Sequence, residues 1–248
     1  MNAVKDMLKS GQTAIGTDGS ITSDVRFLAN SGFDFLLFDT QHAPVEIKAL
    51  QPQLAAMRGR TAIPIIRVGE NRQDQICYAL DQGAKGIIVP MVNTKEEAEN
   101  MVAWCKYPFE GVRSSAGPRG EWGEFKSYRE YMDIVNEHLL IIPMIETQEA
   151  LDSIDEILSV PGIDVLLVGP SDLSINLDVA LDYPNPKYLG ALDKIASACK
   201  KVGVAPGMYF VPPGIEPSEL IAKGFRFFTL PWGGWASKGI NDGLAGIR

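Results

Sequence analysis

The feature that most constrains this chain is a series of short apolar runs that recurs from one end to the other. The runs are rich in Val, Ile, Leu and Phe and show no polar alternation, which is typical of strands covered on both faces of a parallel sheet. We predict eight such strands, over Thr13–Gly16, Phe33–Phe38, Ile63–Val68, Gly86–Val92, Leu139–Ile145, Val165–Val168, Ala205–Phe210 and Phe225–Leu230.

Amphipathic segments separate most of these runs and favour α-helices. The predicted helices are Pro44–Met57, Gln73–Leu80, Glu96–Lys106, Gln148–Leu158 and Lys187–Lys201. Thr94 followed by Glu97 predicts a capping box, and Thr147 is placed to cap the next helix. A glycine at the C′ position, which supplies the left-handed residue of a short loop, is predicted after several helices, at Gly32, Gly83, Gly203 and Gly224.

Strand and helix units repeated in this way, without a linker, predict a single (β/α)8 TIM barrel over residues 1–248. A doubly wound open sheet is the alternative, but it would need a G-x-G-x-x-G turn after its first strand, and Ile15–Gly19 lacks one. The longest connection, Tyr107–Glu137, is expected to be a lid or substrate loop.

Composition narrows the possible partners and compartments. The formal net charge is −8, so the chain lacks the basic character that binding of a nucleic-acid backbone requires. Three widely spaced cysteines, Cys77, Cys105 and Cys199, indicate reduced thiols in a cytoplasmic protein, without zinc or disulfides. We find neither an apolar leader nor a long apolar run, and therefore expect no export and no membrane partner.

The catalytic residues of a barrel of this type lie at the carboxyl ends of its strands. Asp39 ends the second run, and His42 follows it in the strand-to-helix loop. We predict that the Asp39 carboxylate bonds one ring nitrogen of His42 and leaves the other as a base near neutral pH. The structural alternative is that His42 caps the next helix. His138 adjoins the opposite end of a strand and is interpreted as structural.

Glu146 and Asp172 follow the fifth and sixth strands, so their carboxylates should lie side by side. Because two such charges repel, we predict a hard divalent cation such as Mg²⁺ or Mn²⁺ between them. The alternative is an ordinary salt bridge with Arg67, or a helix cap. Arg67 itself ends an apolar strand and is predicted to meet an anion.

The turn after the sixth strand is a candidate anion site. The backbone N–H groups of Ser171, Asp172 and Leu173 would lie at the start of a helix and could bind a carboxylate or phosphate. Gly169, before Pro170, permits the anion to come close to the backbone. A Schiff-base lysine is the alternative route to the same carbon chemistry. No lysine ends a strand, however, and Lys85 precedes one.

Taken in order, these motifs resemble the HpcH/HpaI aldolase family over nearly the whole chain. The resemblance rests on the segments FDFLLFDTQHAP, IPIIRV, GAKGIIVPMV, YPFEGVR, IET and VGPSDLS. It implies a class II, metal-dependent aldolase that reversibly cleaves 4-hydroxy-2-oxo acids, of the 2-keto-3-deoxy sugar acid or 4-hydroxy-2-oxoheptanedioate type, to pyruvate or hydroxypyruvate and an aldehyde.

The resemblance also implies roles for particular residues. Glu146 and Asp172 would hold Mg²⁺, Mn²⁺ or Co²⁺, which chelates the oxo acid. Arg67 would stabilise the enolate, His42 with Asp39 would act as acid and base, and the turn Gly169–Leu173 would hold the substrate carboxylate. A homo-oligomer is implied as well, in the family commonly a hexamer in which a C-terminal helix packs on a neighbour.

Three departures from the family pattern bear on substrate identity. Asp39-Thr-Gln-His42 replaces the usual Asp-Gly-Glu-His, Met144 stands where a glutamine is common, and Pro231–Ser237 differs from the usual loop. The last helix, Ser237–Arg248, is expected to be short and broken by glycines. The alternatives are a CoA-ester lyase with Arg113–Arg119 as phosphate-binding loop, an oxo-acid decarboxylase, and a catalytically silent metabolite-binding barrel.

Overall fold

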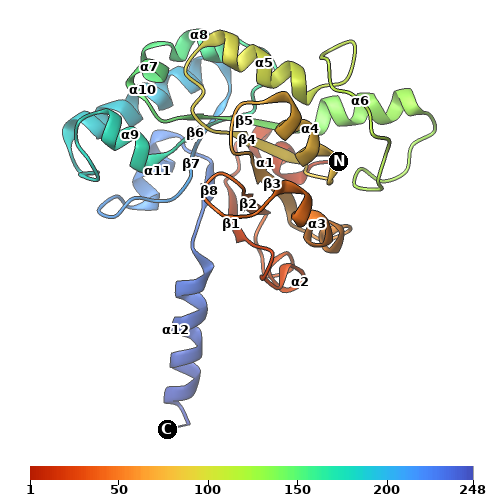
Figure 1. The fold of residues 1–248 in the computed structure, drawn as a ribbon. Coiled ribbons are helices and arrows are strands. Elements are labelled where there is room, and N and C mark those ends of the chain that lie inside the picture. The colour runs from red at the N-terminus through yellow and green to blue at the C-terminus, as the bar shows by residue number, and fades with distance from the viewer. Residues whose placement is uncertain (248) are drawn as a thin grey trace.

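Each strand pairs in parallel with the next one along the chain, and the last strand closes against the first (Figure 1). The computed structural model describes residues 1–247. It confirms the eight predicted strands and the (β/α)8 barrel. The strands are β1 Ala14–Gly19, β2 Phe35–Asp39, β3 Ile63–Arg67, β4 Gly86–Val89, β5 Leu140–Ile145, β6 Val165–Val168, β7 Ala205–Met208 and β8 Phe227–Thr229.

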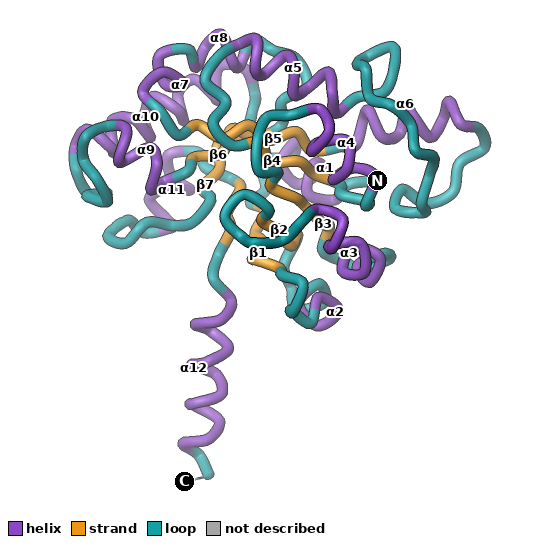
Figure 2. The backbone as a smooth tube through the Cα atoms, in the orientation of Figure 1, coloured by secondary structure: helices purple, strands orange, loops and turns teal. Residues whose placement is uncertain are grey.

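The chain also forms helices, most of which surround the barrel on its outer side, as the tube view shows (Figure 2). They are α1 Ala3–Lys9, α2 Val25–Leu28, the 3-10 helix Ile47–Leu50, α3 Gln51–Met57, α4 Gln73–Asp81, α5 Lys95–Cys105, α6 Tyr128–His138, α7 Gln148–Asp152, α8 Ile154–Leu158, α9 Pro170–Asn176, α10 Pro186–Val202, α11 Pro217–Lys223 and α12 Trp232–Ala245. Among the described residues, no helix combines the length and the apolar character needed to cross a bilayer.

The apolar core forms two shells because neighbouring residues of a strand point to opposite faces. Side chains such as Phe35, Leu37 and Phe227 fill the lumen, while Leu36 and Phe38 pack outward against the helices. The lumen is crowded, since a Cβ on Gly16 would come within 2.2 Å of the Phe35 ring. The interior below the mouth is therefore packed solid.

The predicted helix signals are largely confirmed. Thr94 and Glu97 form the capping box, and Thr147 accepts a hydrogen bond from the Ala150 amide. Gly203 and Gly224 adopt left-handed conformations at the ends of α10 and α11. Two predicted helices are interrupted. Pro44–Met57 becomes a short 3-10 helix followed by α3, which begins beside Pro52, and Gln148–Leu158 divides at Ser153 into α7 and α8.

Two other segments differ more from expectation. The predicted long loop Tyr107–Glu137 includes all but the last residue of α6, which the Ser127 side chain caps by accepting from the Glu130 amide. The predicted break in the last helix is wrong, because α12 is continuous despite its glycines. It projects away from the barrel and has no buried residue (Figure 1).

Candidate active site

The strand register brings the predicted residues to one mouth of the barrel. Asp39 and Arg67 are direct partners in the β2–β3 ladder, at the carboxyl ends of both strands. Glu146 follows β5 and Asp172 lies in the first turn of α9, directly after β6. Phe35 and Ile65 point into the lumen, and because side chains alternate along a strand, Asp39, four residues after Phe35, and Arg67, two residues after Ile65, point to the same inward face.

Asp39 and Arg67 form a two-point ion pair. Arg67 Nε and Nη2 donate to the two oxygens of Asp39 at 2.8 and 2.7 Å. Burial alone would raise the pKa of Asp39, but the hydrogen bonds and charge of Arg67 outweigh it and lower the pKa below its ordinary value of 3.8. Both groups therefore stay charged at neutral pH, and the guanidinium is held in a fixed plane.

A third residue, which the sequence interpretation missed, supports the same guanidinium. The Arg67 Cζ lies 4.1 Å from the centre of the Tyr209 ring, directly after β7, and Nη1 lies 4.0 Å from the sulfur of Met144. Arg67 therefore spans the mouth from β3 toward β7. The predicted strand Ala205–Phe210 included Tyr209 as an apolar residue, so no polar signal marked it.

His42 lies in the exposed turn after β2, at the rim of the mouth. The predicted hydrogen bond between its ring and Asp39 is not formed. Asp39 instead accepts from Arg67 and from the Gln41 amide, and the backbone of His42 also contributes to holding this carboxylate. The physical reason is the register, because a guanidinium in the neighbouring ladder position competes better for both oxygens than an imidazole.

Glu146 is buried directly after the end of β5. Its Oε2 accepts from the Met91 amide at 2.8 Å, and the Met91 backbone reaches this position in the left-handed region, with φ of 55°. Gly169 allows the carboxylate to fit, since a Cβ there would lie 2.2 Å from Oε1. Burial, together with the nearby charge of Asp172, raises the pKa of Glu146 above 4.5.

The turn after β6 opens α9 as predicted, with Gly169 preceding Pro170. The Leu173 amide, one of the predicted anion-binding donors, already donates to the Gly169 carbonyl at 3.0 Å. Ser171 and Asp172 lie in the first turn, where amides lack acceptors within the helix. Of the three amides predicted to bind an anion, those of Ser171 and Asp172 therefore remain available.

The donor set at this mouth fits a hard divalent cation. No group of three or more His, Cys, Asp or Glu that suits a metal occurs in residues 1–247, and Arg67 pairs with Asp39 rather than with Glu146 or Asp172. Mg²⁺ commonly uses only one or two carboxylates, with water and substrate oxygens completing its shell. Glu146 is buried beside Asp172, whose charge helps to raise its pKa, and an ion of this kind would offset the repulsion between the two carboxylates.

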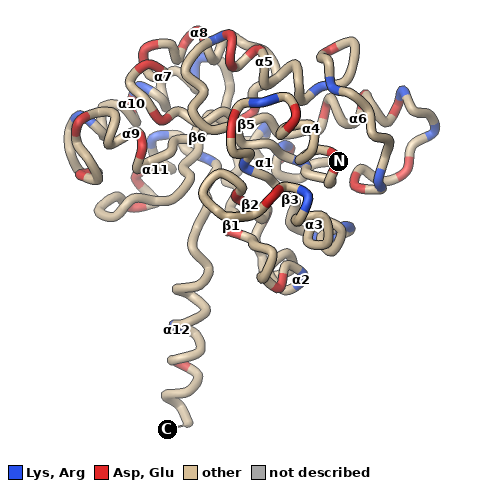
Figure 3. Tube along the Cα trace, in the orientation of Figure 1, with Lys and Arg blue, Asp and Glu red and all other residues tan. Residues whose placement is uncertain are grey.

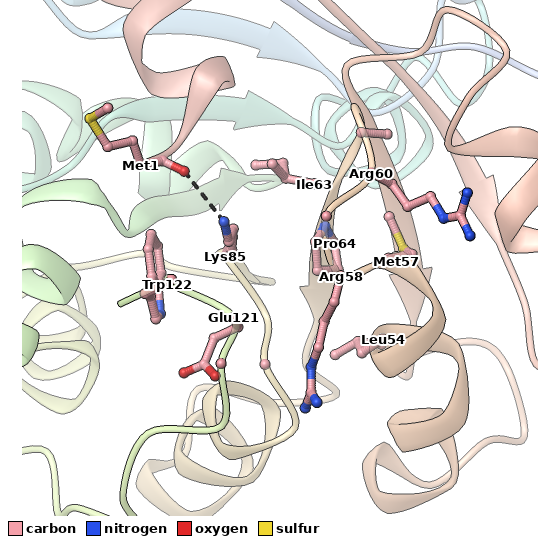
Figure 4. A pocket seen from close by; sticks show the side chains of 15 residues that line it. Met1, Leu54, Met57, Arg58, Arg60, Ile63, Pro64, Lys85, Glu121 and Trp122 are labelled. Carbon is pink, nitrogen blue, oxygen red and sulfur yellow. Dashed lines mark hydrogen bonds between the residues drawn. The ribbon is translucent and has the colours of Figure 1, made fainter. Parts of the chain in front are cut away.

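The basic groups considered for other chemistries lie elsewhere. Lys85 lines a pocket of about 320 Å³ at the opposite end of the barrel, beside Trp122 and Glu121 (Figure 4). Burial lowers its pKa, but it lies before β4 and far from any strand end that forms the mouth. In the loop Arg113–Arg119, the candidate for CoA phosphates, Arg113 is buried, pairs with Asp81 and covers the Tyr107 ring.

Comparisons with known proteins agree with this geometry. The sequence model of the HpcH/HpaI aldolase/citrate lyase family matches residues 18–234. The chain is 34% identical to 4-hydroxy-2-oxo-heptane-1,7-dioate aldolase of Salmonella typhimurium strain LT2, over 92% of this chain and 85% of that protein.

Two solved structures extend the likeness to the fold. An HpcH/HpaI aldolase/citrate lyase family protein from Burkholderia cenocepacia superposes with a TM-score of 0.87 and 27% identity, covering 100% of both chains. The citrate synthase SbnG gives a TM-score of 0.82 at 27% identity, over 98% of this chain and 96% of that one. The match along the sequence, the closed barrel and the relatives together establish that this chain belongs to the HpcH/HpaI aldolase/citrate lyase family.

Proposed function

We propose that the protein is a divalent-metal-dependent aldolase that reversibly cleaves a 4-hydroxy-2-oxo acid to pyruvate, or hydroxypyruvate, and an aldehyde. The observation that carries this proposal is the placement of Arg67, which Asp39 and Tyr209 hold rigidly at the mouth that also contains Glu146 and Asp172. The activity of the Salmonella typhimurium relative, named for a 4-hydroxy-2-oxo acid, supports it.

Glu146 and Asp172 would hold Mg²⁺, Mn²⁺ or Co²⁺. Bound there, the cation would supply a Lewis acid for the carboxylate and ketone oxygens of the oxo acid. The protein's own contribution is to keep Glu146 in place, through the Met91 amide on one oxygen and the close approach of Gly169 at the other.

Arg67 has one guanidinium nitrogen that does not bond Asp39. Among the described residues, the hydrogen bond that Nη1 makes is a long one of 4.0 Å to the sulfur of Met144, which leaves this nitrogen available for a substrate oxygen. Cleavage of the C3–C4 bond places negative charge on the ketone oxygen, and a fixed cation stabilises that charge. The Ser171 and Asp172 amides at the start of α9 would bind the carboxylate of the oxo acid.

The second half of the reaction is a proton transfer. A base takes the proton of the C4 hydroxyl as the C3–C4 bond breaks, the aldehyde leaves, and the enolate gains a proton at C3 to give pyruvate. His42 is our candidate for this base, because it is exposed in the turn that directly follows β2 at this end of the barrel. Asp39 acts on it only through the backbone of their shared turn.

We further propose that the protein is a homo-oligomer in which α12 packs on a neighbouring copy. Trp235 and Ile240 of this helix are exposed, and α12 carries few charges along its length (Figure 3). An apolar pocket of about 430 Å³ lies between the start of α12, at Trp232 and Trp235, and the residues Ile15 and Phe27, and a neighbouring copy would bury it together with the exposed face of the helix. Light scattering of the intact chain should give an oligomer, and removal of residues 237–248 should give a smaller species.

One assay tests the proposed reaction. A panel of 4-hydroxy-2-oxo acids should release pyruvate in the presence of Mg²⁺, Mn²⁺ or Co²⁺ and none after metal stripping with EDTA. The variants Glu146→Gln and Asp172→Asn should lose metal binding, measured by calorimetry on the folded protein. Full turnover by the stripped enzyme would contradict the metal-dependent reaction.

A further inference from the structure

One segment of the mouth carries polar side chains that the mechanism above does not use. It is formed by the ends of β7, β8 and β1 and contains Tyr209, Thr229 and Asp18, here called the polar arc. Tyr209 packs against the lumen core, and the two-residue alternation from Phe227 directs Thr229 to the same face. Asp18 pairs in register with Leu37, a lumen residue, so it too points into the mouth.

The sequence interpretation did not place Asp18 on a strand. The apolar run appeared to end at Gly16, but β1 continues to Gly19 because its backbone pairs with β2 through the Gly19–Phe38 position. Gly19 permits this approach, since a Cβ there would lie 2.8 Å from the Phe38 ring. The extension carries the carboxylate of Asp18 into the mouth.

Asp18 is the carboxylate for which the mouth provides no counter-charge. Arg67 matches Asp39, and a divalent cation would offset Glu146 and Asp172. Among the described residues, Asp18 forms no salt bridge, and its Oδ1 lies 3.3 Å from the hydroxyl of Thr17. Its charge therefore acts on whatever enters the polar arc.

The neighbours of Asp18 are hydrogen-bonding groups. Burial raises the pKa of Tyr209 to about 12, with the charges of Asp39 and Asp18 adding to the effect, so its phenol remains protonated. The Oγ1 of Thr229 is buried and has no hydrogen-bond partner in residues 1–247. This surface suits hydroxyl groups, which donate to carboxylates, and it repels a second carboxylate.

We propose that Asp18 is a specificity-determining residue that selects an uncharged, hydroxyl-bearing aldehyde as the second reactant and disfavours an aldehyde with a distal carboxylate. This inference rests on the proposed aldolase function. It separates this chain from the Salmonella typhimurium relative, whose name denotes a substrate with two carboxylates.

The test compares two aldehydes in aldol addition to pyruvate by the metal-loaded, full-length protein. Glycolaldehyde is the neutral probe and succinic semialdehyde the acidic one. The wild type should have the higher kcat/KM with glycolaldehyde. Asp18→Asn should raise kcat/KM for the semialdehyde about tenfold, the effect of one partly screened charge contact, and should not raise it for glycolaldehyde.

A matched control and a salt series make the result specific. Glu137→Gln removes the same charge from an exposed position at the opposite end of the barrel, and it should leave the preference unchanged. Added salt should reduce the ratio of kcat/KM between the two aldehydes in the wild type but not in Asp18→Asn, because salt screens the repulsion between Asp18 and the carboxylate of the semialdehyde.

Three outcomes would overturn the inference. The inference is contradicted, while the aldolase function stands, if the wild type has the higher kcat/KM with the semialdehyde. It is also contradicted if Asp18→Asn changes kcat/KM for both aldehydes by the same factor. Exchange of pyruvate methyl protons with D₂O needs no aldehyde, so it tests the aldolase function separately from the role of Asp18 in aldehyde selection. If the metal-loaded wild type shows no exchange, the proposed function fails and the inference fails with it.

Discussion

At the scale of single residues, the register of two adjacent strands determines how the reactive groups are arranged. Asp39 and Arg67 are ladder partners, so their side chains meet before either can reach the turn that contains His42. Sequence spacing predicted the contact between Asp39 and His42 because it considers only neighbours along the chain. Arg67, which takes the place predicted for His42, is 28 residues from Asp39 in sequence, and only the fold brings the two together.

The role of His42 has a direct kinetic test. If His42 takes the C4 hydroxyl proton, His42→Ala should lower kcat by about 10²–10⁴-fold, while oxo-acid binding changes little. The control is His138→Ala, because this second histidine ends α6 at the opposite end of the barrel and should leave kcat unchanged. Near-normal cleavage by His42→Ala would assign the proton transfer to another group.

At the scale of elements, the turns that follow the strands position the carboxylates. The β4 turn uses the left-handed Met91 to aim its amide at Glu146, and the β6 turn uses Gly169 to leave room for the same side chain. The sequence predicted the strands and most helices from apolar periodicity and capping residues. It did not predict Met91, because nothing about a methionine signals a positive φ.

Gly169 provides the sharpest test of this arrangement. Gly169→Ala would place a methyl group 2.2 Å from Glu146 Oε1, so the carboxylate must shift. We expect a loss of divalent-metal affinity of at least about tenfold, measured by calorimetry, with the far-ultraviolet circular dichroism spectrum unchanged. Gly190→Ala is the matched control, since a Cβ there meets nothing within 4 Å. Equal metal affinity in both variants would contradict the role of Gly169 in positioning the Glu146 carboxylate.

At the scale of the whole molecule, the chemistry at the mouth depends on a barrel that is closed at its other end. There α1 places Lys5 where its Nζ lies 3.0 Å from Asp164 and 2.9 Å from the Leu139 carbonyl, and Asp164 also accepts from the Ile141 amide. Both charged groups are largely buried. The apolar patterning of α1 and β6 gave no indication of this pair, which forms between segments far apart in sequence.

Breaking this pair should destabilise the entire barrel. Lys5→Met leaves Asp164 buried without its cation, so we expect a loss of about 3 kcal/mol in the free energy of unfolding by urea. The exposed pair of Lys201 and Asp155 supplies the control, because Lys201→Met should cost less than about 1 kcal/mol. A second substitution, Asp164→Asn, should recover part of the loss in the Lys5→Met background. Equal effects of the two lysine variants would contradict the structural role of the buried pair.

The central claim, that this mouth stabilises an enolate with a bound cation and Arg67, is tested most directly by NMR of pyruvate in D₂O. The wild type with Mg²⁺ should exchange the methyl protons of pyruvate. Metal stripping should abolish this exchange, and Arg67→Lys, which loses the two-point geometry to Asp39, should slow it while the melting temperature changes little. Exchange that continues undiminished in the metal-stripped wild type, or in Arg67→Lys, would contradict the account.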